Sequence, residues 1–118
     1  MEKKPSHRLS RAETQIMREI AILLEREIED PRIKNVTISK VSMSLDLRHA
    51  KVYFTLFTSE NNNKENIKKI TYALNHSVSY LRRRIADNLK LRVIPELFFV
   101  YDNQLKDAEH LIDIINKL

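Results

Sequence analysis

The sequence predicts an α+β fold, a two-layer sandwich in which helices pack on one face of a three-stranded sheet. Apolar residues recur every three or four positions over residues 8–29 and again over residues 67–89, which is typical of amphipathic helices. Between these segments, apolar and polar residues alternate over residues 36–44 and 50–58, as in half-buried strands. A third apolar stretch follows at residues 97–101. Strands and helices that come in separate runs favour a sheet with its helices on one side.

The length and composition fit one folded domain. With 118 residues, 42% of them hydrophobic and 31% charged, the chain can bury one core, and we expect a single domain over residues 1–118. Within it we expect a loose basic arm at residues 1–7 and an acidic terminal segment at residues 104–118 that ends in a short helix. The chain has no cysteine, its basic start leads into no apolar run, and no stretch is long enough to span a membrane. We therefore expect a cytoplasmic protein.

The chain contains no glycine. Rossmann fingerprints and phosphate-binding P-loops need glycine so that the backbone can approach phosphates, and the nucleophile elbow of hydrolases needs it for a tight turn. These sites are therefore excluded. The same absence excludes the GXXG clamp with which ordinary KH domains hold single-stranded RNA.

The first helix is expected over residues 8–29. Ser10 and Glu13 have the spacing of a capping box, which indicates the helix start. Pro31 ends the helix, because a proline pushes the residue before it, Asp30, out of the helical region. The polar face mixes both signs of charge, which is typical of a solvated surface.

The two alternating stretches predict a hairpin. In residues 36–44 the alternation slips by one position near residues 39–41, which is what a β-bulge produces. Residues 46–49 form a short turn, so the strand at 50–58 runs antiparallel to the first. That strand places Ala50, Val52, Phe54 and Leu56 on one face. Residues 59–64 follow as an exposed loop.

The second helical segment combines an apolar stripe with the densest basic cluster of the chain. The stripe consists of residues three or four positions apart: Ile67, Ile70, Leu74, Val78, Leu81, Ile85 and Leu89. Taken alone, this periodicity predicts one straight helix with a basic opposite face. Pro95 then marks the start of a strand. The strand at 97–101 is apolar on both faces, which predicts that both faces are covered.

The charge distribution indicates a nucleic-acid surface. The net charge is +5, and residues 31–100 carry 13 Lys and Arg against 5 Asp and Glu, whereas both ends of the chain are slightly acidic. The four histidines show no metal-ligand spacing, and the carboxylates near residues 25–30 are typical of a solvated helix end. We expect no enzyme activity, no metal, no cofactor and no small-molecule substrate.

Three blocks of the sequence resemble the ribosome-binding factor A family. The first two read DPRIKNVTISKVSMSLDLRHAKVYFT, at residues 30–55, and ALNHSVSYLRRRIADNLKLRVIPELFFVYD, at residues 73–102. The third, the acidic end DNQLKDAEHLIDII, is similar to the family's tail. The most specific pieces are DPRI at 30–33, AKVYFT at 50–55 and LRVIPELFFVYD at 91–102.

The resemblance implies a KH-like fold of type II, with the order α-β-β-α-α-β and a three-stranded sheet. It also implies binding to the small (30S) ribosomal subunit and its 16S rRNA near the neck. Members assist late maturation of that subunit and processing of the rRNA ends, many act in growth at low temperature, and none is known as an enzyme. We expect a monomer.

The family also implies a kink between its two later helices. The Ala-x-Gly sequence that usually forms the kink corresponds here to Ser77-Val78-Ser79. A serine hydroxyl can bond back to a carbonyl one turn earlier, which tends to bend a helix. Two further positions depart from the family pattern: Lys40 stands where a strand glycine is common, and the turn arginine has moved to Arg48.

Phosphates need cations, and arginine adds a planar fork that binds two oxygens at once. We expect the main RNA surface to be cationic: Arg82, Arg83, Arg84, Lys90 and Arg92. Further cations extend it: Lys68, Lys69, Arg48 and Lys51. Polar residues around the kink supply hydrogen bonds: Asn75, His76, Ser77 and Ser79. Tyr80 could stack on a base or cover the core, and we favour the core.

Three alternatives stay open. One or two of these arginines could instead pair with Glu96, Asp87 or a helix C-terminus. The chain could also be a protein–protein module, whose mixed-charge first helix and acidic terminal helix dock on a basic partner. A DNA-binding domain is a weaker alternative, because no helix–turn–helix spacing is present.

Overall fold

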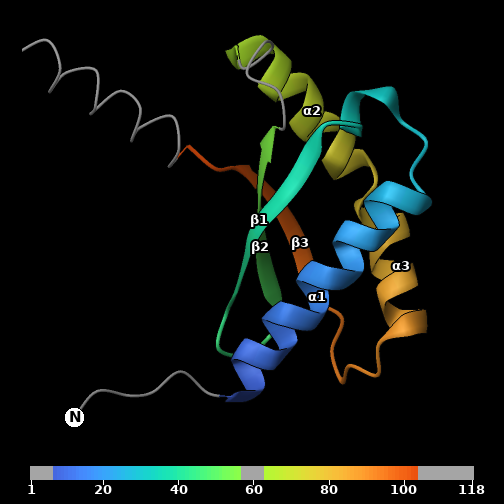
Figure 1. Cartoon of the computed structure of the whole chain (residues 1–118). Helices are drawn as coiled ribbons and strands as arrows, with labels where there is room; N and C mark the ends of the chain where they lie inside the picture. Colours follow the sequence, from blue (N-terminus) through green and yellow to red (C-terminus); the bar gives the residue numbers. More distant parts are fainter. Residues whose placement is uncertain (1–6, 57–62, 104–118) are drawn as a thin grey trace, which may run out of the picture.

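The computed structural model describes residues 7–56 and 63–103. Their order confirms the α-β-β-α-α-β arrangement (Figure 1). The elements are α1 (His7–Arg26), a short 3₁₀ turn η1 (Pro31–Ile33), β1 (Val36–Met43), β2 (His49–Leu56), α2 (Lys64–His76), α3 (Val78–Asn88) and β3 (Glu96–Tyr101). The terminal segment 104–118, the arm before His7 and most of the expected loop lie outside the described residues.

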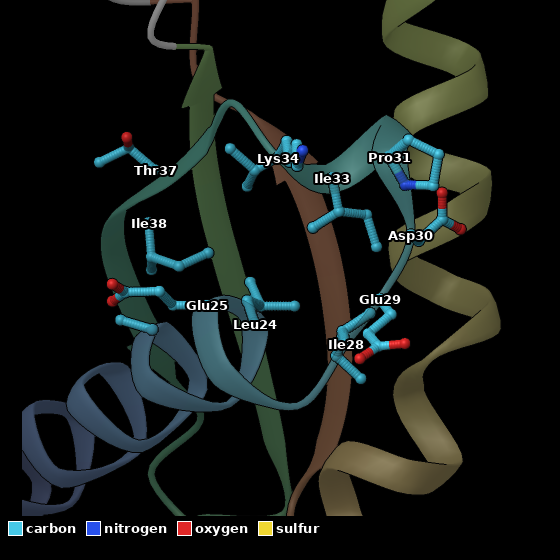
Figure 2. A pocket seen from close by; sticks show the side chains of 12 residues that line it. Leu24, Glu25, Ile28, Glu29, Asp30, Pro31, Ile33, Lys34, Thr37 and Ile38 are labelled. Atoms are coloured by element: carbon cyan, nitrogen blue, oxygen red, sulfur yellow. The ribbon is translucent and has the colours of Figure 1, made fainter.

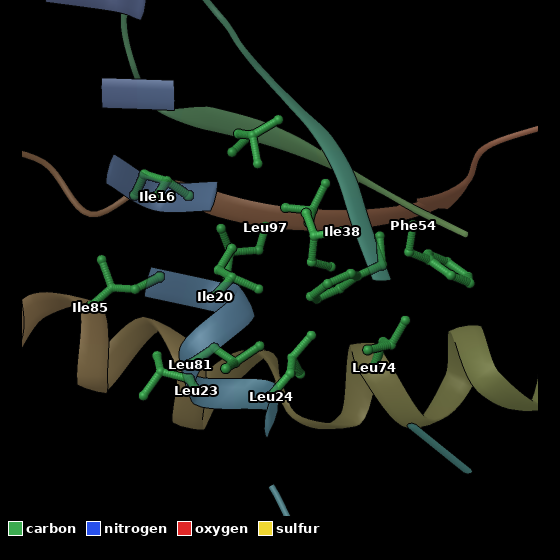
Figure 3. Close-up of a cluster of buried hydrophobic side chains, with 14 of the residues drawn as sticks. Ile16, Ile20, Leu23, Leu24, Ile38, Phe54, Leu74, Leu81, Ile85 and Leu97 are labelled. Carbon is green, nitrogen blue, oxygen red and sulfur yellow. The ribbon is translucent and has the colours of Figure 1, made fainter. Parts of the chain in front are cut away.

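The sheet is mixed, with β2 as its central strand. β1 pairs with β2 antiparallel through the hairpin, and β3 pairs with the other edge of β2 in parallel. A parallel neighbour requires a crossover, which α2 and α3 supply. The three helices lie on one side of the sheet (Figures 1 and 3), so the described residues form the expected two layers.

The core lies between these layers (Figure 3). Ile16 and Ile20 of α1, Phe54 of β2, Leu74 of α2 and Leu81 of α3 are all fully buried. The stripe predicted for the second helical segment is therefore confirmed as its core-facing side. Burial of such a side chain stabilises the fold by about 1.5–3 kcal/mol.

The β-bulge lies where the slipped alternation predicts it. Ile38 pairs with Phe54 and Lys40 with Tyr53, so Ser39 is the extra residue of β1. Its hydroxyl donates to the Asp102 carboxylate, 2.9 Å away. The bulge returns the later half of β1 to the core phase, which explains why Val41 is buried.

The start of α1 differs from the prediction. Ser10 and Glu13 lie inside the helix, so the capping-box interpretation is wrong. Glu13 Oε2 instead accepts a hydrogen bond from the backbone N–H of Met43, at 2.8 Å. That contact fixes the helix to the end of β1, and it depends on a neighbour 30 positions away along the chain.

The end of α1 also comes earlier than predicted, at Arg26. Asp30 is nevertheless extended (φ −120°, ψ 117°), as a residue before proline should be, and it caps η1 through a bond from the N–H of Arg32. The helix had already ended, so Pro31 begins η1 and does not stop α1.

The prediction that β3 is covered on both faces is wrong. Leu97 and Phe99 are buried under the helices, whereas Phe98 is 46% exposed and Val100 is 36% exposed on the opposite face. Two-sided apolar sequence is typical of a strand between two layers. Here the second face of β3 is open among the described residues.

Candidate nucleic-acid interface

The segment predicted from periodicity as one straight helix is broken at Ser77. α2 ends at His76, α3 begins at Val78, and Ser77 between them has φ −88° and ψ −4°. Its hydroxyl donates to the carbonyl of Ala73 at 3.1 Å, one turn earlier. The kink implied by the family resemblance is therefore present, and the serine hydroxyl makes the back-bond expected of it.

The solvent side of the kink is polar and aromatic. Asn75, His76 and Ser79 are exposed there, and Ser77 is partly buried. Tyr72 is 66% exposed, and its ring stacks on the imidazole of His76 with centroids 6.1 Å apart. Lys68 and Lys69 are also exposed, one turn earlier on α2. We call this set (Lys68, Lys69, Tyr72, Asn75, His76, Ser79) the kink surface.

Two of the three consecutive arginines are used inside the protein. The Arg82 guanidinium donates to the carbonyls of Ile94 (3.1 Å) and Pro95 (3.0 Å), and so holds the loop before β3. Arg84 pairs with Glu27 at 3.0 Å and with Asp87 at 3.5 Å. Pairing of one or two arginines was the alternative drawn from the sequence, and its Asp87 partner is observed.

Arg83 differs from its neighbours. Its side chain is exposed, and among residues 7–56 and 63–103 it forms no hydrogen bond or ion pair. Because α3 turns its apolar residues Leu81 and Ile85 toward the sheet, position 83 points to solvent. Of the three arginines, Arg83 alone has a guanidinium with no hydrogen bond or ion pair to a described residue, so all of its donors are available to a ligand.

Tyr80 is not a core residue, contrary to the prediction. It is 36% exposed, and its hydroxyl donates a hydrogen bond to Glu27 Oε1. Donation from Tyr80 and, next, from Arg84 holds the pKa of the Glu27 carboxyl below its usual value. The same contact with Glu27 raises the pKa of Arg84. These three residues tie the end of α1 to α3.

Five cations converge on one pocket of about 550 Å³. They come from three separate parts of the chain: Arg8 and Arg11 from α1, Arg48 from the β1–β2 turn, and Lys90 and Arg92 from the loop between α3 and β3. We call these five residues and their cavity the basic pocket. Within the described residues, none of the five side chains forms an ion pair.

The rest of the basic pocket offsets only part of its charge, because one carboxylate faces five cations. The lining residues other than the five cations include apolar Met43, Leu91 and Val93, and one carboxylate, Asp46. Asp46 Oδ1 is already engaged, since it accepts from the Ser44 hydroxyl at 2.6 Å and from the N–H of Arg48 at 3.1 Å. These bonds, that from Ser44 first, hold the pKa of Asp46 below its usual value.

The turn that carries Arg48 is unusual in its backbone. Leu47 has φ 61°, a left-handed conformation that costs about 1–2 kcal/mol in a residue other than glycine. The N–H of Leu47 bonds the carbonyl of Ser44 at 2.9 Å, which helps to hold the turn. Strain of this kind is often found at binding sites. It places Leu47 and Arg48 in the wall of the basic pocket.

Comparison with known proteins establishes the family of this chain. The model of the family described as ribosome-binding factor A matches residues 8–115. The chain belongs to the ribosome-binding factor A family. The resemblance read from the sequence is thus confirmed over nearly the whole chain.

Individual members of the ribosome-binding factor A family show the same likeness. The protein of Shewanella amazonensis is 39% identical over 111 residues, which are 94% of this chain and 79% of that one. The crystal structure of ribosome-binding factor A from Thermus thermophilus has a TM-score of 0.67 at 26% identity, over 79% of this chain and 94% of that one. A homology model of the Thermus thermophilus protein, fitted into a cryo-EM map of a 30S–RbfA complex, has a TM-score of 0.61 at 25% identity, over 77% and 91%.

For this ribosome-binding factor A chain, the predicted RNA residues fall into separate groups. Arg48, Lys90 and Arg92 meet in the basic pocket, and the kink residues form the kink surface with Lys68 and Lys69. Lys51 lies on the open face of the sheet, opposite Phe98 in the strand register. Their role as RNA contacts stays a prediction.

Sequence reasoning missed Arg8 and Arg11 as site residues of this family member. Their spacing of three places both on one side of α1, which a helical projection would have shown. The sequence gives no sign that this side of α1 faces a loop more than 70 positions later, at Lys90 to Val93. That residues from α1, the β1–β2 turn and the loop before β3 together form the basic pocket could therefore be seen only in the folded structure.

A second cavity, of about 750 Å³, has the opposite character (Figure 2). It lies between the end of α1, the η1 segment and the start of β1, and its apolar lining includes Leu24, Ile28 and Ile33. Glu25, Glu29 and Asp30 line it as well, against one cation, Lys34. We call it the acidic-rimmed cavity.

In the part of the chain that the structure describes, no group of three or more His, Cys, Asp or Glu side chains could hold a metal ion. The same part of the chain contains no helix that is long and apolar enough to cross a membrane.

Proposed function

We propose that this protein binds the immature small ribosomal subunit through its 16S rRNA, in the cytoplasm, and assists late maturation and processing of the rRNA ends without catalysing a reaction itself. One observation carries the proposal: five cations from α1, the hairpin turn and the loop before β3, none of them in an ion pair with a described residue, converge on the basic pocket. The Thermus thermophilus relative whose homology model is fitted into a 30S–RbfA map supports the choice of partner.

The chemistry of the basic pocket matches RNA phosphates. Arginine guanidinium groups bind phosphate oxygens in pairs, and four of the five cations are arginines. Among the described residues that line the pocket, the one carboxylate is Asp46, which its own turn holds, so the lining keeps a net positive charge. The kink surface and Arg83 offer a second set of polar and cationic contacts, as the sequence hypothesis expects.

The test compares two double variants that remove equal charge. Arg11→Gln/Arg48→Gln takes two cations from the basic pocket, whereas Arg18→Gln/Arg26→Gln takes two exposed cations from α1 outside it. Co-sedimentation with purified immature small subunits over a salt series should show weaker binding and a salt slope reduced by about 0.7–0.9 per lost phosphate contact for the first variant. Equal effects of the two variants would mean that net charge alone matters.

The maturation role has its own readout. Cells whose only copy carries Arg11→Gln/Arg48→Gln should accumulate 16S rRNA with unprocessed ends at low temperature, because the subunit is released too early to finish. Cells with Arg18→Gln/Arg26→Gln should process the rRNA normally. Normal rRNA processing in the strain with Arg11→Gln/Arg48→Gln would show that the basic pocket is not needed for maturation. The proposed role in maturation and end processing would then be wrong.

The acidic-rimmed cavity favours a second candidate function, docking of a basic protein segment. Its apolar lining can take an aliphatic anchor, and Glu25 and Glu29, which form no ion pair with a described residue, repel phosphate but attract Lys and Arg. Because the chain has no cysteine, Lys34→Cys puts a single photo-crosslinker in the wall of this cavity.

On purified small subunits, a crosslink from Lys34→Cys to a ribosomal protein that survives RNase treatment would support the protein-docking candidate. A product that RNase digests would show RNA at this position and contradict it. Ser79→Cys, on the kink surface, is the matched control, and the proposed function expects an RNase-sensitive product there.

A further inference from the structure

The side of the sheet that faces away from the helices carries an aromatic and basic surface. Alternation along the strands puts Lys40 of β1, Lys51 and Tyr53 of β2, and Phe98 and Val100 of β3 on this side. The two lysines are exposed, Tyr53 is partly exposed, and the helices of the described chain lie on the other side (Figure 1). We call these five residues the open sheet face.

The register arranges this face in two rows across the sheet. One row runs Ser42, Lys51, Phe98, and the next runs Lys40, Tyr53, Val100. Neighbouring strands are about 4.8 Å apart and the two rows about 6.6 Å apart, so each ring has a lysine or a second apolar group beside it. Lys40 Nζ already lies 5.4 Å from the centroid of the Tyr53 ring.

Carboxylates are kept to the ends of the open sheet face. Glu96, at the start of β3, pairs with His49 at 3.7 Å. Asp102, just beyond β3, accepts a bond from Ser39. Between them, the two central rows contain lysines and rings but no acidic residue. A surface on which Lys51 lies beside Phe98 and Lys40 beside Tyr53 is unlike the core of a protein–protein interface, from which lysine is depleted.

Aromatic rings next to cations form a surface suited to binding unpaired nucleotides. Bases of single-stranded RNA stack on aromatic side chains while lysines hold the backbone, and sheets of other RNA-binding domains present aromatic residues in this way. A duplex hides the faces of its bases in its own stack, so it cannot use such a surface. The chemistry of this face therefore selects single-stranded RNA.

The open sheet face is continuous with the basic pocket along one strand. Arg48 lines the pocket, β2 starts at the next residue, and Lys51 and Tyr53 follow on the open side. The ring of His49, at the junction, lies 6.0 Å from the ring of Phe98. A strand of RNA whose phosphates enter the pocket is thus led onto the rings of the sheet.

We propose that the open sheet face stacks unpaired bases of the RNA strand whose phosphates are held at the basic pocket, with Phe98 as the principal stacking residue. This inference rests on the proposed function. It assigns recognition of single-strandedness to the sheet and charge neutralisation to the pocket. The factor then distinguishes an rRNA segment that has not yet paired from the same segment in a duplex.

The test uses the absence of tryptophan from the chain. The variant Phe98→Trp carries a single indole at the proposed stacking position. Titration with a short oligouridine should quench its fluorescence in parallel with binding followed by anisotropy of a labelled oligomer. Heparin, a polyanion without bases, and a blunt RNA duplex should bind the cations without quenching. Binding of oligouridine with unchanged indole emission would overturn the inference and leave the basic pocket intact.

Affinity measurements separate the inference from the function on which it rests. Phe98→Leu should weaken oligouridine binding about fivefold or more while the salt slope stays constant, because the ring contacts no phosphate. Phe98→Tyr should keep the affinity, and Ile22→Ala, an exposed apolar position on α1, should leave it unchanged. Arg48→Gln should instead lower the salt slope.

Failure of Phe98→Leu to change affinity, with the effect of Arg48→Gln intact, overturns the inference alone. Failure of Arg48→Gln overturns the proposed function of the pocket. Thermal unfolding of each variant checks that it is folded. If the Phe98→Trp indole is shielded from acrylamide before RNA is added, then this chain's own residues or a second copy cover the face, and the inference is wrong.

Discussion

Adjacent arginines of identical chemistry have different tasks here, because α3 turns each of them to a different environment. Arg82 reaches back to the carbonyls of Ile94 and Pro95, Arg84 meets Glu27, and Arg83 between them points into solvent. The sequence RRR indicates a cation-rich surface, but only the packing of the neighbouring loop and of α1 decides which charge is free. A triple charge reversal would therefore mix the loss of fold contacts with the loss of RNA contacts.

Single substitutions should separate these tasks. Arg82→Ala removes the donors of two carbonyls, so we expect the free energy of unfolding to fall by about 1.5–3 kcal/mol in urea titrations. Arg83→Ala should change stability by less than about 0.5 kcal/mol, as exposed substitutions usually do, but should weaken binding to small subunits. Similar destabilisation by both variants would refute the assignment of Arg82 to the fold and Arg83 to the surface.

Glu27 makes the stability depend on pH. Bonds from Tyr80 and Arg84 lower its pKa in the folded state below the ordinary value of 4.5, so the unfolded state binds protons more readily. The stabilisation is therefore complete above about pH 4.5 and is lost as the pH falls through the lowered folded pKa. We expect Glu27→Gln to be less stable than the parent near neutral pH, and the difference in unfolding free energy to shrink below that window.

The matched control for Glu27 is Glu25→Gln, two positions earlier on an exposed side of α1. The free energy of unfolding of this variant should differ little from that of the parent. If both variants give the same pH profile, the contact between α1 and α3 through Glu27 does not contribute as proposed.

At the scale of helices and strands, the features that depend on neighbouring residues in the chain are the ones that the sequence predicts correctly. The bulge at Ser39, the hairpin and the apolar stripe of α2 and α3 depend on neighbours in the chain and were predicted from it. The capping-box prediction failed because the Glu13 carboxylate accepts a hydrogen bond from the N–H of Met43, a contact between residues far apart in the chain. The break at Ser77 could not be derived from periodicity, because the stripe keeps its phase through the bend; the family resemblance supplied it.

The kink at Ser77 should persist without its hydroxyl. Leu74 before it and Leu81 after it are fully buried, and this packing outweighs one hydrogen bond of about 1 kcal/mol. We expect Ser77→Ala to lower the unfolding free energy by about 1 kcal/mol. Spin labels at Lys68→Cys and Asp87→Cys should give the same distance in both backgrounds. A longer distance in Ser77→Ala would show that the hydroxyl itself makes the bend.

At the scale of the molecule, charge is divided along α1. Arg8 and Arg11 in its first turns line the basic pocket, and Glu25 near its end lines the acidic-rimmed cavity, so the helical rise keeps these opposite charges about 21–26 Å apart along the axis. Net charge and its bias toward residues 31–100 were visible in the sequence. The two poles were not, because Arg8 and Arg11 belong to a segment whose net charge is slightly negative. Only the fold brings those arginines to Arg48 and Arg92.

The parallel pairing of β3 has a consequence for the order of synthesis. β2 ends at Leu56 and its partner β3 begins only at Glu96, so a ribosome adding about 5–20 residues per second makes β2 about 2–8 s before β3. During that interval one edge of the central strand has no partner, although the hairpin can already close on the other edge. The exposed edge is a template for pairing with another nascent chain. The yield of folded protein should therefore depend on how soon α2 and α3 fold and bring β3 to the free edge of β2.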